Sequence, residues 1–127
     1  MKILNYFLIS SVLILSIACN DDDDDDPCVA GSLEETIVGS WTVTLDDSAG
    51  GEVEFKTDGT LIDDDDIIVG FIGGSDHKHY VVTSNEDFTA TAVKDSFMIE
   101  AEIYVTKYSC NEINLDNFGL EMKMTRK

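Results

Sequence analysis

The stretch GSWTVTL, residues 39–45, decides the fold of this chain. Its apolar side chains Trp41, Val43 and Leu45 alternate with the polar Thr42 and Thr44. Successive side chains of a β-strand point to opposite faces, so this period of two predicts a strand with one apolar and one solvated face. Such a strand belongs to a sheet that buries a single face, which is typical of antiparallel sheets.

The same alternation of apolar and polar residues recurs in later segments of the chain, which are separated by residues typical of turns. Ala-Gly-Gly at 49–51 is predicted as a turn, and Asp58-Gly59 favours a tight hairpin because Gly accepts the positive φ that the turn requires. The apolar positions that repeat with period two are Val53, Phe55; Phe88, Ala90, Ala92; Ile99, Ala101, Ile103, Val105; Ile113, Leu115; Leu120, Met122 and Met124. We therefore predict an all-β fold, a small antiparallel meander.

Only one short helical turn is expected. Ser32 is followed three residues later by Glu35, the pattern of a capping box, and the helical stretch ends before Gly39. A short helix ahead of a strand that contains Trp can close one end of a barrel.

Length and charge exclude several classes of function. The chain has 127 residues, which suits a single domain, and 8 Lys plus Arg against 26 Asp plus Glu give a net charge of −18. Nucleic-acid binding needs clustered basic side chains that neutralise phosphates, and the sequence has no such cluster. The charge favours instead a self-repelling monomer or a cationic partner.

The first residues are predicted to be a targeting signal. Lys2 and an apolar run up to Ile17 have the pattern of a secretory signal, although a retained membrane helix is an alternative. The run ends in Ala18-Cys19, which resembles the lipobox of bacterial lipoproteins, with Leu15 one position further from the Cys than usual. This resemblance implies a signal peptide at residues 1–18 and lipidation of Cys19, hence attachment to a membrane through an N-terminal lipid such as palmitate.

A charged tether is expected to follow at residues 19–32. Six Asp occupy positions 21–26 and Pro27 follows them, a composition that stays extended and holds a domain away from a surface. Cys19 with this Asp tract resembles the surface-export signal of lipoproteins in the Bacteroidetes. On that resemblance we expect attachment to the outer membrane, facing the cell exterior.

Two further cysteines remain in what would be an oxidising compartment. Cys28 and Cys110 are expected to form a disulfide, with two free thiols as the alternative. Closing the long loop between them would contribute about 4 kcal/mol in the chain-entropy model.

The domain at residues 33–127 resembles the lipocalins and their bacterial lipocalin-like relatives. Gly39-Ser40-Trp41 matches the G-x-W signature that opens their first strand, and Arg126 at the end of the last strand matches their Arg across the Trp. The resemblance implies a closed barrel with Arg126 on the indole face. The domain is shorter than a full lipocalin and lacks that family's C-terminal helix, so a filled barrel without a cavity is a second expectation.

The best candidate for a ligand site is the apolar run IIVGFIGG, residues 67–74. We predict a buried strand there, and the alternative is a mobile apolar loop at the barrel mouth, whose Gly residues let it move over a ligand. The side chains expected to line a pocket are Phe55, Phe71, Phe88 and Ile103.

Catalysis and metal binding have little support in the sequence. His77 and His79 would share one face of a strand, but two histidines beside Lys78 are a weak metal site, and no metal or cofactor is expected. There is no G-x-S-x-G, P-loop, C-x-x-C or H-E-x-x-H motif. We therefore expect a non-catalytic, lipid-anchored binding protein for a small apolar or amphipathic ligand. The alternative is an acidic surface module that binds a cationic protein.

Overall fold

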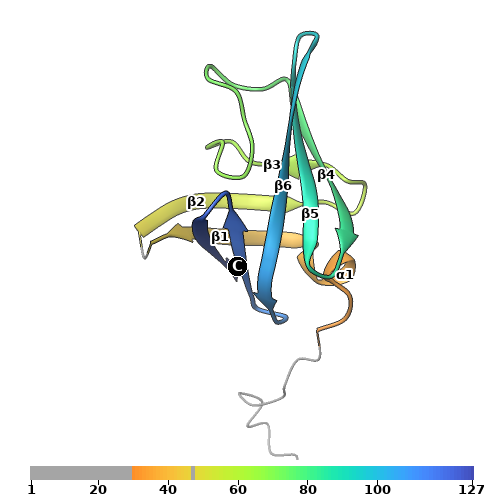
Figure 1. Ribbon diagram of the computed structural model, residues 1–127, viewed down its shortest axis with the longest axis vertical. Coiled ribbons are helices and arrows are strands. Elements are labelled where there is room, and N and C mark those ends of the chain that lie inside the picture. Colours follow the sequence, from red (N-terminus) through yellow and green to blue (C-terminus); the bar gives the residue numbers. More distant parts are fainter. Residues whose placement is uncertain (1–29, 47) are drawn as a thin grey trace, which may run out of the picture.

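The computed structural model describes residues 30–46 and 48–127 (Figure 1). The predicted signal peptide, Cys19, the Asp tract and Cys28 therefore lie outside the described residues. Within them, eight antiparallel strands and one short helix form a nearly closed barrel, so the prediction of an all-β antiparallel barrel is confirmed. The elements in chain order are α1 (Leu33–Ile37), β1 (Gly39–Leu45), β2 (Ser48–Phe55), β3 (Leu61–Ile62), β4 (His77–Ser84), β5 (Asp87–Lys94), β6 (Phe97–Tyr108), β7 (Glu112–Asn117) and β8 (Leu120–Arg126).

The strands follow one another as a meander that closes through its first and last members. Their order in the sheet is β3-β2-β1-β8-β7-β6-β5-β4, and β1 pairs with β8 in the register Trp41 to Arg126. Between β3 and β4 the described residues form only one isolated bridge, Thr60 to His79. The barrel therefore has a weak seam between β3 and β4.

The helix α1 is capped as the sequence predicts. The Ser32 side chain accepts from the Glu35 backbone N–H, and the Glu35 carboxylate accepts from the Ser32 N–H, which confirms the capping box. Leu33 and Ile37 are buried, so α1 covers one end of the barrel. The described residues contain no helix long and apolar enough to cross a bilayer.

The inward side chains of the strands fill the interior. Phe55 packs edge-to-face on Tyr80 and on Phe88, with ring centroids 4.9 and 5.6 Å apart. The largest fully buried side chains are Trp41, Phe55, Phe88, Leu33, Ile37, Ile103, Ile113, Leu115 and Met124. The barrel is packed like a core, which is what a small eight-stranded barrel permits.

The turn predicted at residues 49–51 is wrong, because these residues belong to β2. The chain reverses earlier, where Leu45 pairs with Ser48. Gly51 has φ +142°, and a Cβ there would lie 2.6 Å from Asp65 Oδ2 and 2.7 Å from Ile67 Cδ1. Glycine in this strand therefore allows the 63–76 segment to approach the sheet closely.

The buried strand predicted at residues 67–74 is also wrong. These residues form bends and a turn within the long connection between β3 and β4. Ile68 and Val69 are nevertheless buried in the core, while Ile72 is fully exposed. The segment is therefore a loop, as in the alternative, and its movement over a ligand stays a prediction.

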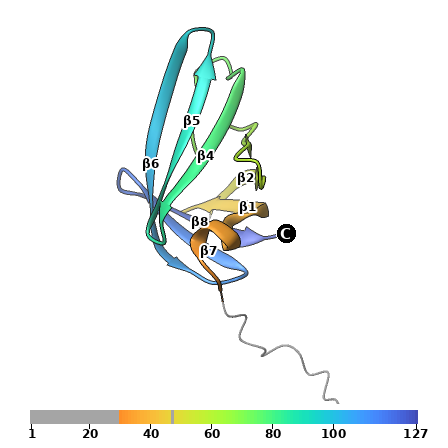
Figure 2. The same ribbon diagram turned by 90° about the vertical axis from the view of Figure 1, so that its right-hand side faces the viewer.

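The β5–β6 hairpin extends beyond the rest of the barrel, at the end opposite α1 (Figures 1 and 2). Its tip carries Phe97, Met98 and Ile99, which are 69%, 62% and 38% exposed. Apolar side chains are thus exposed at the end far from the point where the described chain begins.

Candidate functional site

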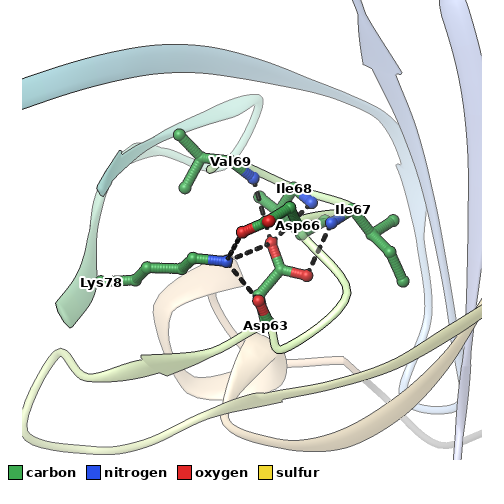
Figure 3. Close-up of polar contacts among 6 residues, drawn as sticks. All are labelled: Asp63, Asp66, Ile67, Ile68, Val69 and Lys78. Atoms are coloured by element: carbon green, nitrogen blue, oxygen red, sulfur yellow. Dashed lines mark hydrogen bonds and ion pairs between the residues drawn. The ribbon is translucent and has the colours of Figure 1, made fainter. Parts of the chain in front are cut away.

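The loop at the barrel mouth is organised by one buried carboxylate, Asp63 (Figure 3). Its side chain is fully buried and accepts hydrogen bonds from the backbone N–H groups of Ile67, Ile68 and Val69, at 2.7, 2.8 and 3.0 Å. A carboxylate that satisfies several backbone donors holds a loop in one conformation without a strand partner. Asp63 therefore fixes Ile68 and Val69 in the barrel interior.

Lys78 of β4 provides the cation beside this carboxylate. Its ammonium lies 3.6 Å from Asp63 Oδ2 and 2.6 Å from Asp66 Oδ1, and it also donates to the Asp63 carbonyl. The Lys78 side chain is only 8% exposed. Because an unpaired buried charge is costly, Lys78 and the two carboxylates tie the loop to β4 as one unit.

Four of the eight exposed large apolar side chains among the described residues lie on this loop and at the tip of the β5–β6 hairpin. Lys94, which pairs across the hairpin with Phe97, directs its ammonium to the Ile72 carbonyl at 3.4 Å. Asp76 Oδ2 accepts from the Asp95 N–H at 2.7 Å. These contacts place Ile72 near the hairpin tip. We call Ile72, Phe97, Met98 and Ile99 the apolar tip.

The structure places the four residues predicted to line a pocket in the core or packed against it. Phe55, Phe88 and Ile103 have no exposed surface, and Phe71 is partly buried against the core. None of them lines any of the five main surface hollows formed by the described residues. Their side chains fill the interior instead of surrounding a cavity.

The Trp41 end of the barrel is built around Arg126. The Arg126 guanidinium carbon lies 4.2 Å from the centroid of the Trp41 ring. Its nitrogens donate to three carbonyls, those of Cys110 at 2.7 Å, Val38 at 3.1 Å and Thr36 at 2.6 Å. The Trp41 indole N–H donates to the Ile37 carbonyl at 2.8 Å. Arg126 thus satisfies carbonyls at the C-terminal end of α1, those of Thr36 and of the C-cap Val38, and joins the helix to the last strand.

The two histidines do not form part of a larger set of ligands. His77 and His79 stack side by side on β4, with ring centroids 6.4 Å apart. Among the described residues no group of three or more His, Cys, Asp or Glu side chains is placed to hold a metal.

Cys110 is disulfide-bonded. Its expected partner, Cys28, lies outside the described residues, so this pairing stays a prediction. Cys110 lies in the β6–β7 connection, and its backbone carbonyl accepts a hydrogen bond from Arg126.

Sequence reasoning missed Asp63 and Lys78. Asp63 sits in a run of four Asp, all of which the sequence presents as a solvated stretch. Lys78 lies between two histidines on a strand that shows no apolar alternation at its start. The usable signal was the position of Asp63 four residues before the start of the apolar run at Ile67, because Asp often accepts from backbone N–H groups a few residues ahead.

Comparison of the chain with protein-family models, with curated proteins and with solved structures found no match.

Proposed function

We propose that this chain is a non-catalytic binding protein of the cell envelope that contacts another protein through the apolar tip. The observation that carries the proposal is the contrast between a filled interior and exposed Phe97, Met98 and Ile72. Several exposed apolar side chains at one end of a domain favour an interaction site there, because their exposure to water is otherwise unfavourable. The apolar tip lies on a projecting hairpin and on the loop that contacts it, and not in a cavity, which suits a protein surface better than a small molecule.

Membrane attachment is part of the proposal and rests on the sequence. Ala18-Cys19 after an apolar run supports lipidation at Cys19, and the Asp tract supports a tether that faces the cell exterior. Because α1 lies opposite the hairpin (Figure 2), a tether at the N-terminal side would direct the apolar tip away from the membrane. Cells that express the chain and receive an alkyne-labelled palmitate should give a labelled protein, and Cys19→Ser should abolish the label.

The test of the apolar tip uses photocrosslinking in intact cells. A photoreactive phenylalanine analogue at position 97 or 98 should yield one recurrent crosslinked protein, identified by mass spectrometry. The matched control is position 118, because Phe118 is 88% exposed but lies on the β7–β8 turn. The same crosslinked protein from all three positions, or none from 97 and 98, would overturn the proposal.

A second candidate function is the binding of a small apolar or amphipathic ligand inside the barrel. This function is favoured because two buried core residues, Ile68 and Val69, belong to a loop and not to a strand. Their displacement would free space in the core cluster to which Phe55 and Phe88 also belong, while the hydrogen-bonded strands stay in place.

Native mass spectrometry before and after organic extraction separates the two functions. Small-ligand binding predicts added mass that extraction removes, and uptake of a fatty acid that increases in Asp63→Asn, where the loop is released. Protein binding predicts the mass of the chain alone in both samples.

A further inference from the structure

The strand β4 has an open edge. On one side it pairs with β5 along its length. On the other side the Tyr80 N–H donates to the Gly59 carbonyl at 2.9 Å next to the Thr60–His79 bridge, and no other described strand pairs there. Residues two apart on a strand direct their backbone groups to the same side, so the N–H and C=O of Val82 point away from β5. This segment can accept one more strand.

The open edge is at the floor of a groove between α1 and the β2–β3 turn. This groove has a volume of about 790 Å³, and its lining includes Val38 beside α1, Asp58 of the turn, and Tyr80, Val81 and Val82 of β4. The Tyr80 hydroxyl donates to the Lys56 carbonyl at 2.6 Å, and the Leu33 N–H donates to Asn85 Oδ1 at 2.9 Å. These bonds hold both walls, so the groove is preformed.

The charge of the groove is negative. The described residues that line it include Glu34, Glu35 and Asp58 and no basic side chain. Glu34 and Asp58 both raise the pKa of Tyr80, so their field reaches the floor of the groove. The Thr60 side chain and N–H hydrogen-bond to Asp58 and lower its pKa, which keeps this carboxylate ionised.

We propose that the open edge of β4 pairs with an extended basic segment of a protein partner, which adds a strand along Val81 and Val82 and places Lys or Arg against Glu34 and Asp58. Main-chain hydrogen bonds would supply affinity, and the acidic walls with Val38 and Val81 would select alternating basic and apolar side chains. This occupant is favoured over a second copy or the chain's own Asp tract, because both carry the same negative charge as the groove. The inference rests on the proposed function only in taking the ligand to be a protein.

The experiment titrates the purified full chain with three short blocked peptides and follows its backbone amide signals by NMR. The first peptide is Thr-Lys-Val-Lys-Val-Lys-Thr, the second has Glu for each Lys, and the third is the basic peptide with alternate N-methylated amides. The basic peptide should shift the signals of Val81, Val82, Asp58 and α1. The acidic and N-methylated peptides should bind at least about tenfold more weakly, since each lacks one of the two interactions.

Two variants locate the site. Val82→Pro removes the outward N–H without removing a β4–β5 hydrogen bond. Glu34→Gln with Asp58→Asn removes two of the three carboxylates that line the groove, retains the Glu35 of the capping box and keeps an Asn-Gly turn. Each variant should bind the basic peptide about tenfold more weakly than the unsubstituted chain does. The control is Glu102→Gln with Glu121→Gln, whose side chains are exposed on β6 and β8.

Several results would overturn the inference. These are no binding of the basic peptide, equal binding of the N-methylated peptide, equal loss of binding in the control variant, or a change of oligomeric state caused by Val82→Pro. The last result would assign the edge to a second copy. Tip substitutions leave this edge intact, so crosslinking failure at position 97 with retained peptide binding would reject the apolar tip alone.

Discussion

Gly39 has φ +130°, a backbone conformation that residues with a Cβ rarely adopt, and a Cβ there would lie 2.6 Å from Arg126 Nη1. Gly39→Ala therefore either strains the start of β1 or displaces the guanidinium from the Val38 carbonyl, to which Nη1 donates. We expect the free energy of unfolding to fall by about 2–3 kcal/mol, the range for a strained residue at a fixed position. Urea unfolding followed by Trp41 fluorescence measures it.

Gly119→Ala is the matched control for this prediction. Gly119 also has a positive φ, +83°, but an added Cβ would contact nothing within 4 Å. Its loss should be about 1 kcal/mol, from the backbone alone. Equal losses in the two variants would mean that the approach of Arg126 to Gly39 contributes nothing to stability.

The Asp63 carboxylate has two roles at once: it accepts the hydrogen bonds of the loop, and its charge neutralises Lys78. In Asp63→Asn one carboxylate oxygen becomes an NH₂ group, which faces the backbone donors of Ile67–Val69, and Lys78 loses part of its neutralising charge. Because these groups are buried, we expect a loss of about 2–4 kcal/mol in the free energy of unfolding. Chemical denaturation measures the loss.

The control for Asp63→Asn is Asp64→Asn. Asp64 is the next residue along the chain but is exposed, so its substitution should change stability by less than about 0.5 kcal/mol. Amide hydrogen exchange of Ile67–Val69 should also accelerate in Asp63→Asn only. If exchange there is unchanged, the loop is held by its buried apolar side chains and not by the carboxylate.

At the scale of elements, the strands that could be predicted are those whose alternation follows from burial of one face. Trp41 and Val43 of β1, and Ile113 and Leu115 of β7, are buried where the period of two puts them. Residues 67–74 could not be assigned in this way, because their run has no alternation. Their conformation depends on Asp63, whose hydrogen bonds replace those of a strand ladder.

The strand β4 escaped prediction for a related reason. Its inward positions include Lys78, whose charge is acceptable in the interior only because Asp63 and Asp66 lie beside it. A periodicity argument treats such a lysine as solvated, so the start of β4 has no readable apolar face. Ile99 is the opposite case. It occupies a position of β6 that the alternation assigns to the barrel interior, yet it is exposed, because the hairpin extends beyond the barrel (Figure 1).

The seam between β2–β3 and β4 yields a prediction about pH. Burial raises the pKa of the Tyr80 hydroxyl, and the carboxylates of Asp58 and Glu34 raise it further. The unfolded chain therefore releases this proton first, near pH ~10. Stability from Tyr80 is fully present below that pH and falls as pH rises toward the folded pKa, because the folded state then binds more protons.

Tyr80→Phe should remove this alkaline loss. At neutral pH the variant should be about 1 kcal/mol less stable, because the hydrogen bond to the Lys56 carbonyl is lost. Its stability should then decline less steeply than that of the natural chain above pH ~10. Tyr104→Phe is the control, since Tyr104 is exposed on β6. Parallel curves for Tyr80→Phe and the natural chain would show that Tyr80 does not link the seam to pH.

At the scale of the whole molecule, the barrel requires two things: a meander of antiparallel strands, and pairing between the first and the last strand of that meander. The alternation predicts strands, but closure depends on the pairing of β1 with β8, which Arg126 and Trp41 support. Whether the interior is hollow could not be predicted, because it depends on the summed volume of side chains such as Phe55 and Phe88, and on loop residues that no strand pattern includes. The filled interior therefore comes from packing and not from sequence period.

The barrel carries most of the chain's negative charge: without the six Asp at 21–26 and without Lys2, the net charge of −18 becomes −13. This charge makes the stability of the barrel depend on salt in a predictable direction. Like charges repel one another more strongly in the compact state than in the unfolded chain, and added salt screens this repulsion. Salt also screens ion pairs, but Lys123–Glu112 and Lys127–Glu52 are exposed and contribute little, while Lys78 is buried. Salt should therefore stabilise the barrel, because it weakens the repulsion between like charges more than it weakens the ion pairs.

We expect the melting temperature to rise by about 4–8 °C between low salt and ~0.5 M NaCl, which corresponds to about 1 kcal/mol for a domain of this size. The triple variant Glu100→Gln, Glu102→Gln, Glu121→Gln removes exposed charges from β6 and β8. It should melt higher at low salt and gain less from NaCl. A melting temperature that falls with salt would instead mean that the Lys78 cluster is accessible to ions, and that the loop over the barrel mouth opens before the barrel unfolds.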